Sequence, residues 1–323
     1  MAARIIDPAE VAEKYREEIR ADIARLSRPP LLVGILSTDH GPSRTYAEWT
    51  GRACEEVGVG FELRQIPRMQ VEQAIREANA DPRVDGIIVY YPVFGTQQDH
   101  YLRDLVDPMK DIEGLHSHWA RALYENRRFV DEARTRKAIV PCTPLAILKL
   151  LDAAGACGPG PRPLAGKTAC VFNRSEVVGR PLASMMANDG ARVISFDVDG
   201  PQLFVPGPEG EGHGVEEIDI DRAGALAQAD IVVTGVPSRD FPPVRAEEIK
   251  PGAICVNFST VRNFADDIVE KAGVFIPRVG TMTVTMALRN IVRLRRHAEE
   301  AGAASRGAEG GRSPGGCPTG RGR

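Results

Sequence analysis

The chain has 323 residues, of which 43% are hydrophobic and 26% are charged, and its formal net charge is −3. At roughly 150 residues per domain, this length predicts about two domains with a large buried core. The weakly negative charge argues against nucleic acid or an anionic membrane as the main partner. No apolar run approaches the ~20 residues that a membrane-spanning helix needs, so we expect no membrane association.

The first 20 residues carry mixed charges and no apolar core, a pattern typical of neither a signal peptide nor a transit peptide. We therefore expect a cytoplasmic protein. The cysteines form no C-x-x-C pair, so we expect reduced thiols without a disulfide framework or a zinc site. His116 and His118 are spaced like two metal ligands on a strand, but no third ligand is evident and we expect no bound metal.

Strand-like and helix-like segments alternate in the first half of the chain. Apolar or alternating runs predict strands near residues 31–36, 61–66 and 85–91. Helical periodicity predicts helices near residues 43–57 and 71–79. This alternation is typical of an α/β fold, in which helices cover a mostly parallel sheet.

The second half repeats this rhythm after a connecting helix near residues 140–154 and a loop rich in Gly and Pro at residues 158–163. Residues 283–300 predict a long amphipathic helix, and we interpret residues 199–217 as a surface insertion. The tail, residues 301–323, has almost no large apolar side chains, so we expect it to be disordered. Further strands are predicted near residues 168–172, 192–196, 231–234, 253–258 and 274–276.

The predicted strand at residues 168–172 runs into the sequence N-R-S-E-V-V-G-R-P-L-A, residues 173–183, and a helix follows that ends at Asp189-Gly190. This order suits a dinucleotide-binding unit, because a helix N-terminus offers free N–H groups and partial positive charge to a pyrophosphate. Gly179 would permit close backbone approach. Only one of the usual three glycines is present, so this motif alone is weak evidence.

Asp197 ends the second strand of this unit, 18 positions after Gly179. A carboxylate there can accept both hydroxyls of an adenosine ribose and repels a 2′-phosphate, which favours NAD over NADP. Arg174 weakens this preference for NAD, because it could pair with a phosphate of either cofactor. Asp197 could instead be a solvent-facing strand end, and Asp199 is the alternative ribose partner.

The residues Thr234-Gly235-Val236-Pro237 follow another predicted strand at its carboxyl end. Ligands gather at such ends in open α/β sheets, so this segment is a second candidate for a cofactor contact. The alternative interpretation is an ordinary turn.

Five motifs occur in order along the chain. They are S-R-T-Y (Ser43 to Tyr46), P-M-K-D-I-E-G-L-H (Pro108 to His116), P-C-T-P-L-A (Pro141 to Ala146), N-R-S-E-V-V-G-R-P (Asn173 to Pro181) and V-G-T-M-T (Val279 to Thr283). Together they resemble the methylenetetrahydrofolate dehydrogenase/cyclohydrolase family, over about residues 5–297 and with matching spacing.

The resemblance implies two α/β domains that flank a cleft in which folate and nicotinamide meet, the second domain being a Rossmann-like doubly wound parallel sheet. It assigns residues 1–145 to a folate-binding domain and residues 146–283 to an NAD-binding domain. The helix at residues 284–300 would pack back on the first domain, and residues 301–323 would form the tail. It also implies a homodimer formed through the cofactor domain, and a role in the one-carbon metabolism that supplies purine biosynthesis.

Two departures from the family pattern concern the cyclohydrolase reaction. Bifunctional members carry a lysine four residues after the motif tyrosine, whereas here Thr50 follows Tyr46 at that spacing. They carry glutamine where this chain has Tyr90. Adding water to a methenyl bridge needs proton transfer, which suits an amine and not a threonine hydroxyl. The chain is thus similar to the eukaryotic monofunctional NAD-dependent branch.

Three other interpretations stay open at this point. The chain could be a bifunctional enzyme with residual cyclohydrolase activity. It could be an oxidoreductase of similar layout that acts on a hydroxy or amino acid, although no proton acceptor for that reaction is evident. It could also be a non-catalytic protein that binds NAD or folate.

The resemblance implies three catalytic candidates. Glu113 stands where bifunctional relatives have aspartate, and its carboxylate would accept the 2-amino and N3–H groups of the pterin, with Asp111 as the competing candidate. Tyr46 could stack on the folate or hydrogen-bond near the reacting carbon. Cys142 would line the cleft as a small side chain, without a nucleophilic role.

Hydride transfer from the methylene bridge to nicotinamide removes no proton, so orientation and electrostatics can suffice for catalysis. The expected substrate contacts are Tyr46, Tyr90, Asp111, Glu113, Thr281 and Thr283. The expected cofactor contacts are Thr143, Asn173, Arg174, Ser175, Val178, Gly179, Asp197, Val198, Gly235, Val236, Pro237, Asn257, Gly280, Thr281, Met282 and Thr283.

Overall fold

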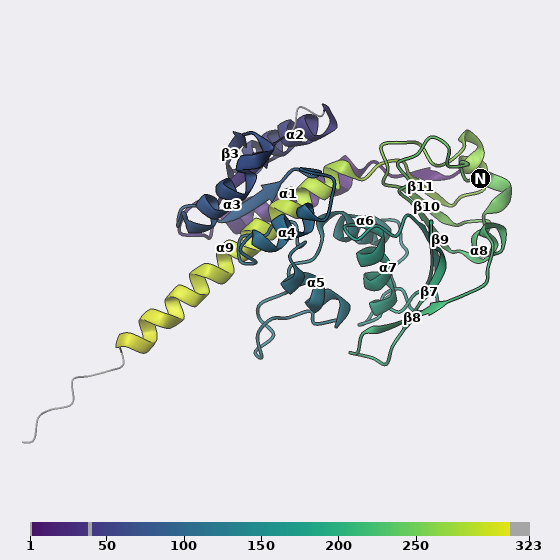
Figure 1. Ribbon diagram of the computed structural model, residues 1–323. Coiled ribbons are helices and arrows are strands. Elements are labelled where there is room, and N and C mark those ends of the chain that lie inside the picture. Colours follow the sequence, from purple (N-terminus) through teal and green to yellow (C-terminus); the bar gives the residue numbers. More distant parts are fainter. Residues whose placement is uncertain (1, 38–40, 311–323) are drawn as a thin grey trace, which may run out of the picture.

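The computed structural model describes residues 2–37 and 41–310 of the chain. It contains two sheets, each covered by helices or short 3-10 turns on both faces (Figure 1). The predicted α/β class with two units is therefore confirmed. No helix within the described residues is long and apolar enough to cross a membrane.

The first sheet has three parallel strands in the order β3-β2-β4. Its central and third strands are buried almost throughout, since alternate side chains enter different cores. Ile87 and Val89 of β4 pack with α3 and α4, whereas Ile88 belongs to the core shared with α6 and α9. The elements of this half are β2 (Leu31–Leu36), α2 (Gly41–Val57), β3 (Gly60–Gln65), η1 (Arg68–Gln70), α3 (Val71–Ala80), β4 (Gly86–Val89), α4 (Gln98–Leu105) and α5 (Ser117–Tyr124).

The second sheet has the order β1-β11-β10-β9-β5-β6-β7-β8. Its first six strands pair in parallel and its last two pair antiparallel. Its elements are α6 (Cys142–Ala153), β5 (Thr168–Phe172), α7 (Gly179–Asn188), β6 (Arg192–Asp197), β7 (Gly200–Pro206), β8 (His213–Glu217), α8 (Arg222–Gln228), β9 (Ile231–Thr234), η2 (Ala246–Glu248), β10 (Ile254–Asn257), η3 (Asp266–Glu270) and β11 (Val274–Ile276).

The N-terminal segment is not where the sequence analysis placed it. The strand β1 (Arg4–Ile5) pairs with β11 at the edge of the second sheet, so these residues lie outside the first unit. The chain then enters α1 (Pro8–Ile23), which the sequence analysis did not predict. Asp7 caps this helix by accepting the N–H of Ala9 at 3.0 Å, and proline occupies its first position.

The interpretation of residues 199–217 as a loop insertion is wrong. These residues form the hairpin β7–β8, which extends the second sheet antiparallel to β6. Leu203 and Phe204 are buried on this hairpin, and their burial against the sheet accounts for its order. The Gly and Pro residues of the segment had concealed the two short strands.

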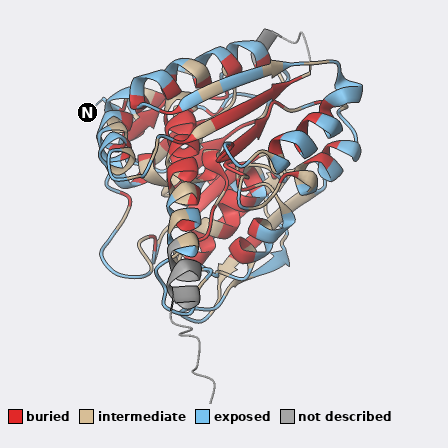
Figure 2. Cartoon of the chain, turned by 90° about the vertical axis from the view of Figure 1, so that its left-hand side faces the viewer, coloured by how far each residue is buried: buried red, intermediate tan, exposed pale blue. Residues whose placement is uncertain are grey.

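The helix α9 (Gly280–Gly310) is longer than predicted. Its first half is buried, and Figure 2 shows exposure increasing toward its C-terminal end. It packs against α1, α2 and α6. The first ten residues of the predicted disordered tail, 301–310, are helical, so that prediction is wrong for them. Residues 311–323 lie outside the described residues.

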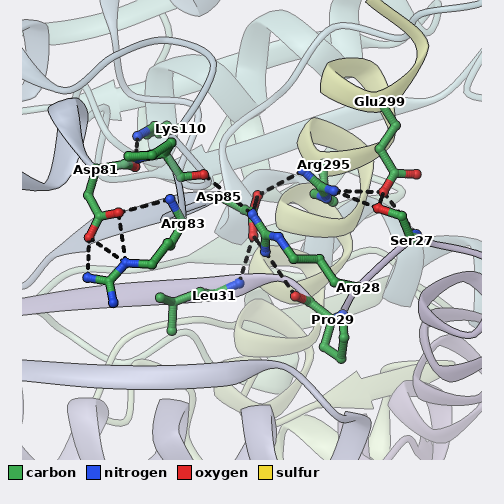
Figure 3. Close-up of polar contacts among 11 residues, drawn as sticks. Ser27, Arg28, Pro29, Leu31, Asp81, Arg83, Asp85, Lys110, Arg295 and Glu299 are labelled. Carbon is green, nitrogen blue, oxygen red and sulfur yellow. Dashed lines mark hydrogen bonds and ion pairs between the residues drawn. The ribbon is translucent and has the colours of Figure 1, made fainter. Parts of the chain in front are cut away.

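A buried carboxylate ties α9 to the first sheet (Figure 3). Asp85, which directly precedes β4, accepts two hydrogen bonds from the Arg28 guanidinium at 2.6 and 2.9 Å. It also accepts the N–H of Leu31 at 2.9 Å, and Arg295 of α9 lies 3.5 Å away. The Asp85 side chain is only 6% exposed, so this ion pair is shielded from water on its carboxylate side.

We expect Asp85→Asn to lower the free energy of unfolding by about 2 kcal/mol, because Arg28 loses its counter-ion in a partly buried place and Arg295 keeps only Glu299. Urea unfolding followed by circular dichroism measures this change. The matched control is Glu72→Gln, whose partner Arg76 and own carboxylate are both about half exposed. Such a surface pair contributes little, so the control should show no measurable change. Equal effects of the two variants would contradict the anchoring role of Asp85.

Candidate active site

A cavity of about 440 Å³ lies where the two halves of the chain meet. The end of β4, the helix α2 and the segment 113–115 contribute to one side. The starts of α6 and α9, the loop before α7 and the residue after β10 contribute to the other. The predicted residues that line it are Tyr46, Tyr90, Glu113, Cys142, Thr143, Val178, Gly280 and Thr283.

Glu113 is a carboxylate at the wall of this cavity. Burial and the nearby Asp111 carboxylate raise the pKa of Glu113 to about 8, and the backbone of Val89 and the Arg103 guanidinium only partly offset this. A carboxyl group with a raised pKa in a cavity is a typical mark of a functional position. Glu113 can accept a ligand's donor edge when it is ionised.

Asp111 does not compete with Glu113 for a ligand. Its buried carboxylate accepts the backbone N–H groups of Glu113 at 3.0 Å, Gly114 at 3.0 Å and His116 at 2.8 Å. It does not line the cavity. Its oxygens therefore fold the loop that positions Glu113, and a contact of Asp111 with the substrate stays a prediction.

Tyr46 of α2 and Tyr90 after β4 lie edge to face in the cavity wall, with ring centroids 5.9 Å apart. Burial is the main cause that raises the pKa of each phenol, so both stay protonated near neutral pH. The hydroxyl of Thr50 donates to the Tyr46 carbonyl at 2.8 Å. Thr50 is buried and does not line the cavity, so it adds no ionisable group to the site.

Cys142 lines the cavity at the start of α6. Burial, followed by the Glu113 and Asp111 carboxylates, raises the pKa of its thiol well above the ordinary value, which keeps it uncharged. Its Sγ donates to the Ile112 carbonyl at 3.2 Å. Asn290 of α9 donates to the Ile112 and Val140 carbonyls at 2.9 and 3.2 Å and lies 3.6 Å from the Cys142 sulfur. A protonated, engaged thiol lines the site and is no nucleophile.

Thr143 and Thr283 lie opposite each other, with hydroxyl oxygens 3.4 Å apart, where α6 meets α9. Gly280, the first residue of α9, also lines the cavity. Met282 is fully buried in the core and does not line the cavity, and its contact with the cofactor stays a prediction. Thr281 is half-buried beside the cavity but does not line it.

The loop between β5 and α7 is held by hydrogen bonds of Asn173 and by the close approach of α7. Asn173 has a φ of 85°, and its side chain accepts the N–H of Ser175 at 2.9 Å and donates to the Gly235 carbonyl at 2.6 Å. A Cβ at Gly179 would lie 1.6 Å from the Asn173 carbonyl oxygen. Only glycine fits where α7 begins, because a Cβ there would collide with the backbone of this loop.

Asp197 lies at the carboxyl end of β6, beside this loop. One carboxylate oxygen accepts the N–H of Arg174 at 2.6 Å and the other accepts the N–H of Val198 at 2.7 Å. Val198 itself is fully exposed in the turn after β6. The Arg174 side chain is 2% exposed and is held by Asp199 and by backbone carbonyls. The guanidinium of Arg174 is thus buried and paired, and its contact with a cofactor phosphate stays a prediction.

The segment Gly235–Val236–Pro237 follows β9 at the same sheet edge, since β9 lies beside β5. Asn263, which is fully buried, fixes this segment by exchanging two hydrogen bonds with Val236, at 2.9 and 3.1 Å.

Asn257 is fully engaged within the protein. Its amide donates to the Ser259 and Pro277 carbonyls at 3.0 and 3.3 Å, and its oxygen accepts the Thr234 hydroxyl at 3.4 Å. Its side chain thus joins β9, β10 and the loop after β11, and the contact of Asn257 with the cofactor stays a prediction.

Comparison with known proteins decides the family. Residues 6–113 match the model described as tetrahydrofolate dehydrogenase/cyclohydrolase, catalytic domain, and residues 141–203 match the NAD(P)-binding domain of the same family. The chain belongs to this family.

Two relatives are named methylenetetrahydrofolate dehydrogenase, NAD(+). The one from Schizosaccharomyces pombe is 40% identical over 300 residues, which is 91% of this chain and 93% of the relative. The one from Saccharomyces cerevisiae is 41% identical over 312 residues, 92% and 97% of the two chains. The solved NAD-dependent 5,10-methylenetetrahydrofolate dehydrogenase of S. cerevisiae superposes with a TM-score of 0.88 at 39% identity, covering 94% of this chain and 100% of that one.

Several residues that line the cavity were not predicted as site residues. Phe258 directly follows β10, and its position at a strand's carboxyl end was a usable signal. Tyr91, Leu115 and Val177 also line the cavity. Glu176, in the loop before α7, pairs across the cleft with His100 of α4 at 3.4 Å and with Arg103 at 3.8 Å. Nothing in the sequence brings these residues together, because the contact depends on how the two halves pack.

Proposed function

We propose that this member of the tetrahydrofolate dehydrogenase/cyclohydrolase family oxidises 5,10-methylenetetrahydrofolate to 5,10-methenyltetrahydrofolate with NAD as the hydride acceptor. It does so by direct hydride transfer and without hydrolysing the product. One observation carries the proposal. Glu113 and Tyr46 from the first half share one cavity with Val178, Gly280 and Thr283 from the cofactor half.

The residues of the first half bind and orient the folate. Ionised Glu113 accepts the 2-amino and N3–H donors of the pterin, and the backbone bonds to Asp111 hold its loop in place. Tyr46, protonated and braced by Tyr90, presents a hydroxyl donor and an aromatic edge to the substrate. These contacts fix the methylene carbon relative to the cofactor half.

The cofactor half fits NAD. The glycine-dependent approach of α7 to the loop at Asn173 leaves room for a pyrophosphate, and Asp197 offers its carboxylate to the ribose hydroxyls. When bound, the nicotinamide supplies the hydride acceptor. Thr143, Thr283 and Gly280 line the wall where the nicotinamide and the pterin meet.

The absence of hydrolysis follows from what the cavity offers to a water molecule. Thr50 is buried with its hydroxyl donated to a backbone carbonyl, and Tyr90 keeps its proton. Neither can take a proton from attacking water near neutral pH. The lining side chains Val178, Phe258 and Val279 are apolar, so they exclude water from the product.

We further propose partners, a cellular location and an oligomeric state for the enzyme. Its partner is a tetrahydrofolate derivative, with neither nucleic acid nor membrane as a partner, and it acts in the cytoplasm, where its product supports purine biosynthesis. It forms a homodimer through its cofactor half. The family resemblance supports the dimer, and light scattering on the purified protein tests it: a single-chain mass would contradict the dimer.

Supplying each substrate separately tests the activity. With methylenetetrahydrofolate present, we expect kcat/KM for NAD to exceed that for NADP by at least about tenfold, because Asp197 repels a 2′-phosphate. With methenyltetrahydrofolate alone, its absorbance should fall no faster than in buffer. Equal use of NADP would contradict the cofactor assignment, and hydrolysis above the buffer rate would contradict the monofunctional assignment.

A further inference from the structure

Arg174 stands in the loop after β5 and turns its side chain away from solvent. Its Nη1 donates to the Ser195 carbonyl at 2.8 Å and to the Gly200 carbonyl at 3.1 Å. Its Nη2 donates to the Gly200 carbonyl at 3.2 Å and is ion-paired with Asp199. With its side chain 2% exposed, this guanidinium is a built-in part of the protein and not a free anion-binding group.

The partners of Arg174 belong to one structural feature, the tight turn between β6 and β7. The chain reverses directly after Asp197, which pairs with Gly200, and Gly200 has a φ of 99° that suits a residue without a Cβ. Asp199 lies in this turn, and its carboxylate is the counter-ion of the guanidinium. An ordinary βαβ unit would leave this sheet edge through a loop and a helix, and would offer no such turn.

The same arginine also positions the ribose-binding carboxylate. Its backbone N–H donates to Asp197 at 2.6 Å, while its guanidinium holds the turn that follows Asp197. Arg174 therefore contacts Ser195 and Asp197 of β6 and Gly200 at the start of β7, beside the proposed ribose site. The guanidinium charge is thus paired with Asp199, while the Asp197 carboxylate is fixed by the backbone N–H groups of Arg174 and Val198.

We propose that the β6–β7 turn sets cofactor specificity by holding Arg174 away from the 2′ position while Arg174 holds Asp197 toward it. This rests on the proposed function and names the positioning residues that make it NAD-specific. Asp197 excludes a 2′-phosphate by repulsion. Asp199 also disfavours the phosphate, because it holds the Arg174 guanidinium that would otherwise bind it. The Asp199 carboxylate is 62% exposed, so removing both carboxylates leaves the guanidinium without a counter-ion and open to solvent where that carboxylate stood, and a phosphate can take its place.

The test compares adenosine 2′,5′-bisphosphate with adenosine 5′-monophosphate by titration calorimetry, which reports binding independently of turnover. The variants are Asp197→Ser, Asp199→Ala and the double variant, alone and combined with Arg174→Gln. Asp219→Ala, an exposed carboxylate of the same half, is the matched control. Thermal unfolding of each variant verifies that it is folded, and the ratio of kcat/KM for NADP to that for NAD is measured in parallel.

We expect the wild-type protein and the control to prefer the monophosphate. Each variant changes the ratio of the affinity for the bisphosphate to the affinity for the monophosphate. In the double variant this ratio should rise by at least about tenfold more than the product of the rises in the two single variants, since Asp197 and Asp199 act through one arginine. Adding Arg174→Gln should abolish this gain. If Asp197→Ser alone gives the same ratio as the double variant, or if the gain remains when Arg174→Gln is added, Asp199 does not act by holding Arg174. NAD dependence would still stand in either case. If the wild-type protein itself uses NADP as well as NAD, the proposed function fails instead.

Discussion

Glu113→Gln is expected to lower kcat/KM for 5,10-methylenetetrahydrofolate by roughly 100-fold, which is the loss of a bidentate, charge-assisted contact. The amide presents its own N–H₂ group to a donor edge of the pterin, so one contact becomes repulsive. Glu113→Asp is the conservative variant, because bifunctional relatives carry aspartate there, and it should retain most of the binding. Steady-state kinetics with saturating NAD measure the effect.

The raised pKa of Glu113 predicts how the reaction depends on pH. Below a pKa of about 8 the free enzyme holds a neutral carboxylic acid that cannot accept two donors, and above it the carboxylate can. The value of kcat/KM reports the free enzyme, so it should rise with pH, reach half of its maximum near pH 8 and level off above about pH 9. Glu113→Gln should abolish this inflection and Glu113→Asp should retain one. A profile that is flat or falls with pH in the wild-type protein would contradict the role of ionised Glu113.

Gly179→Ala is expected to weaken NAD binding by roughly 100-fold and to lower the free energy of unfolding by about 2 kcal/mol. The new Cβ would lie 1.6 Å from the Asn173 carbonyl oxygen and 2.9 Å from the Arg174 Cα, so the cofactor loop must move away from α7. Calorimetric titration with NAD and urea unfolding measure the two effects.

Gly158→Ala is the matched control for this loop. Its added Cβ would meet only the Pro163 carbonyl oxygen, at 3.8 Å, which is an ordinary contact distance. We expect unchanged NAD binding and unchanged stability in this variant. If Gly179→Ala binds NAD as tightly as Gly158→Ala does, the loop at Asn173 is not the pyrophosphate site.

The strands of this fold could be predicted closely where their side chains are buried on both faces. The predicted strands near residues 31–36, 168–172, 231–234 and 274–276 coincide with β2, β5, β9 and β11, because continuous apolar runs leave little choice of register. The helix α1 was not predicted, although Asp7 followed by Pro8 is a capping signal. The β7–β8 hairpin was not, because its strands lack a clear alternating pattern.

The candidate site also has features that the sequence predicts and features that it does not. Glu113, Tyr46 and Gly179 could be predicted, because their motifs carry both the residue type and its spacing. The hydrogen-bond partners of the polar side chains could not be predicted. Asp111 and Arg174 each have an ordinary functional interpretation in the sequence, but their hydrogen bonds go to backbone groups of the folded chain. Such partners are fixed by tertiary packing, which a single sequence does not display.

The most direct test of the central claim follows two absorbance bands after the enzyme is mixed with NAD and 5,10-methylenetetrahydrofolate. One band reports NADH and the other reports 5,10-methenyltetrahydrofolate. If both rise together in equal amounts, the chain is a dehydrogenase that releases its product unhydrolysed, as Thr50 and Tyr90 lead us to expect. If NADH rises while the methenyl band stays flat, beyond spontaneous hydrolysis, a hydrolytic step persists and the monofunctional account is contradicted.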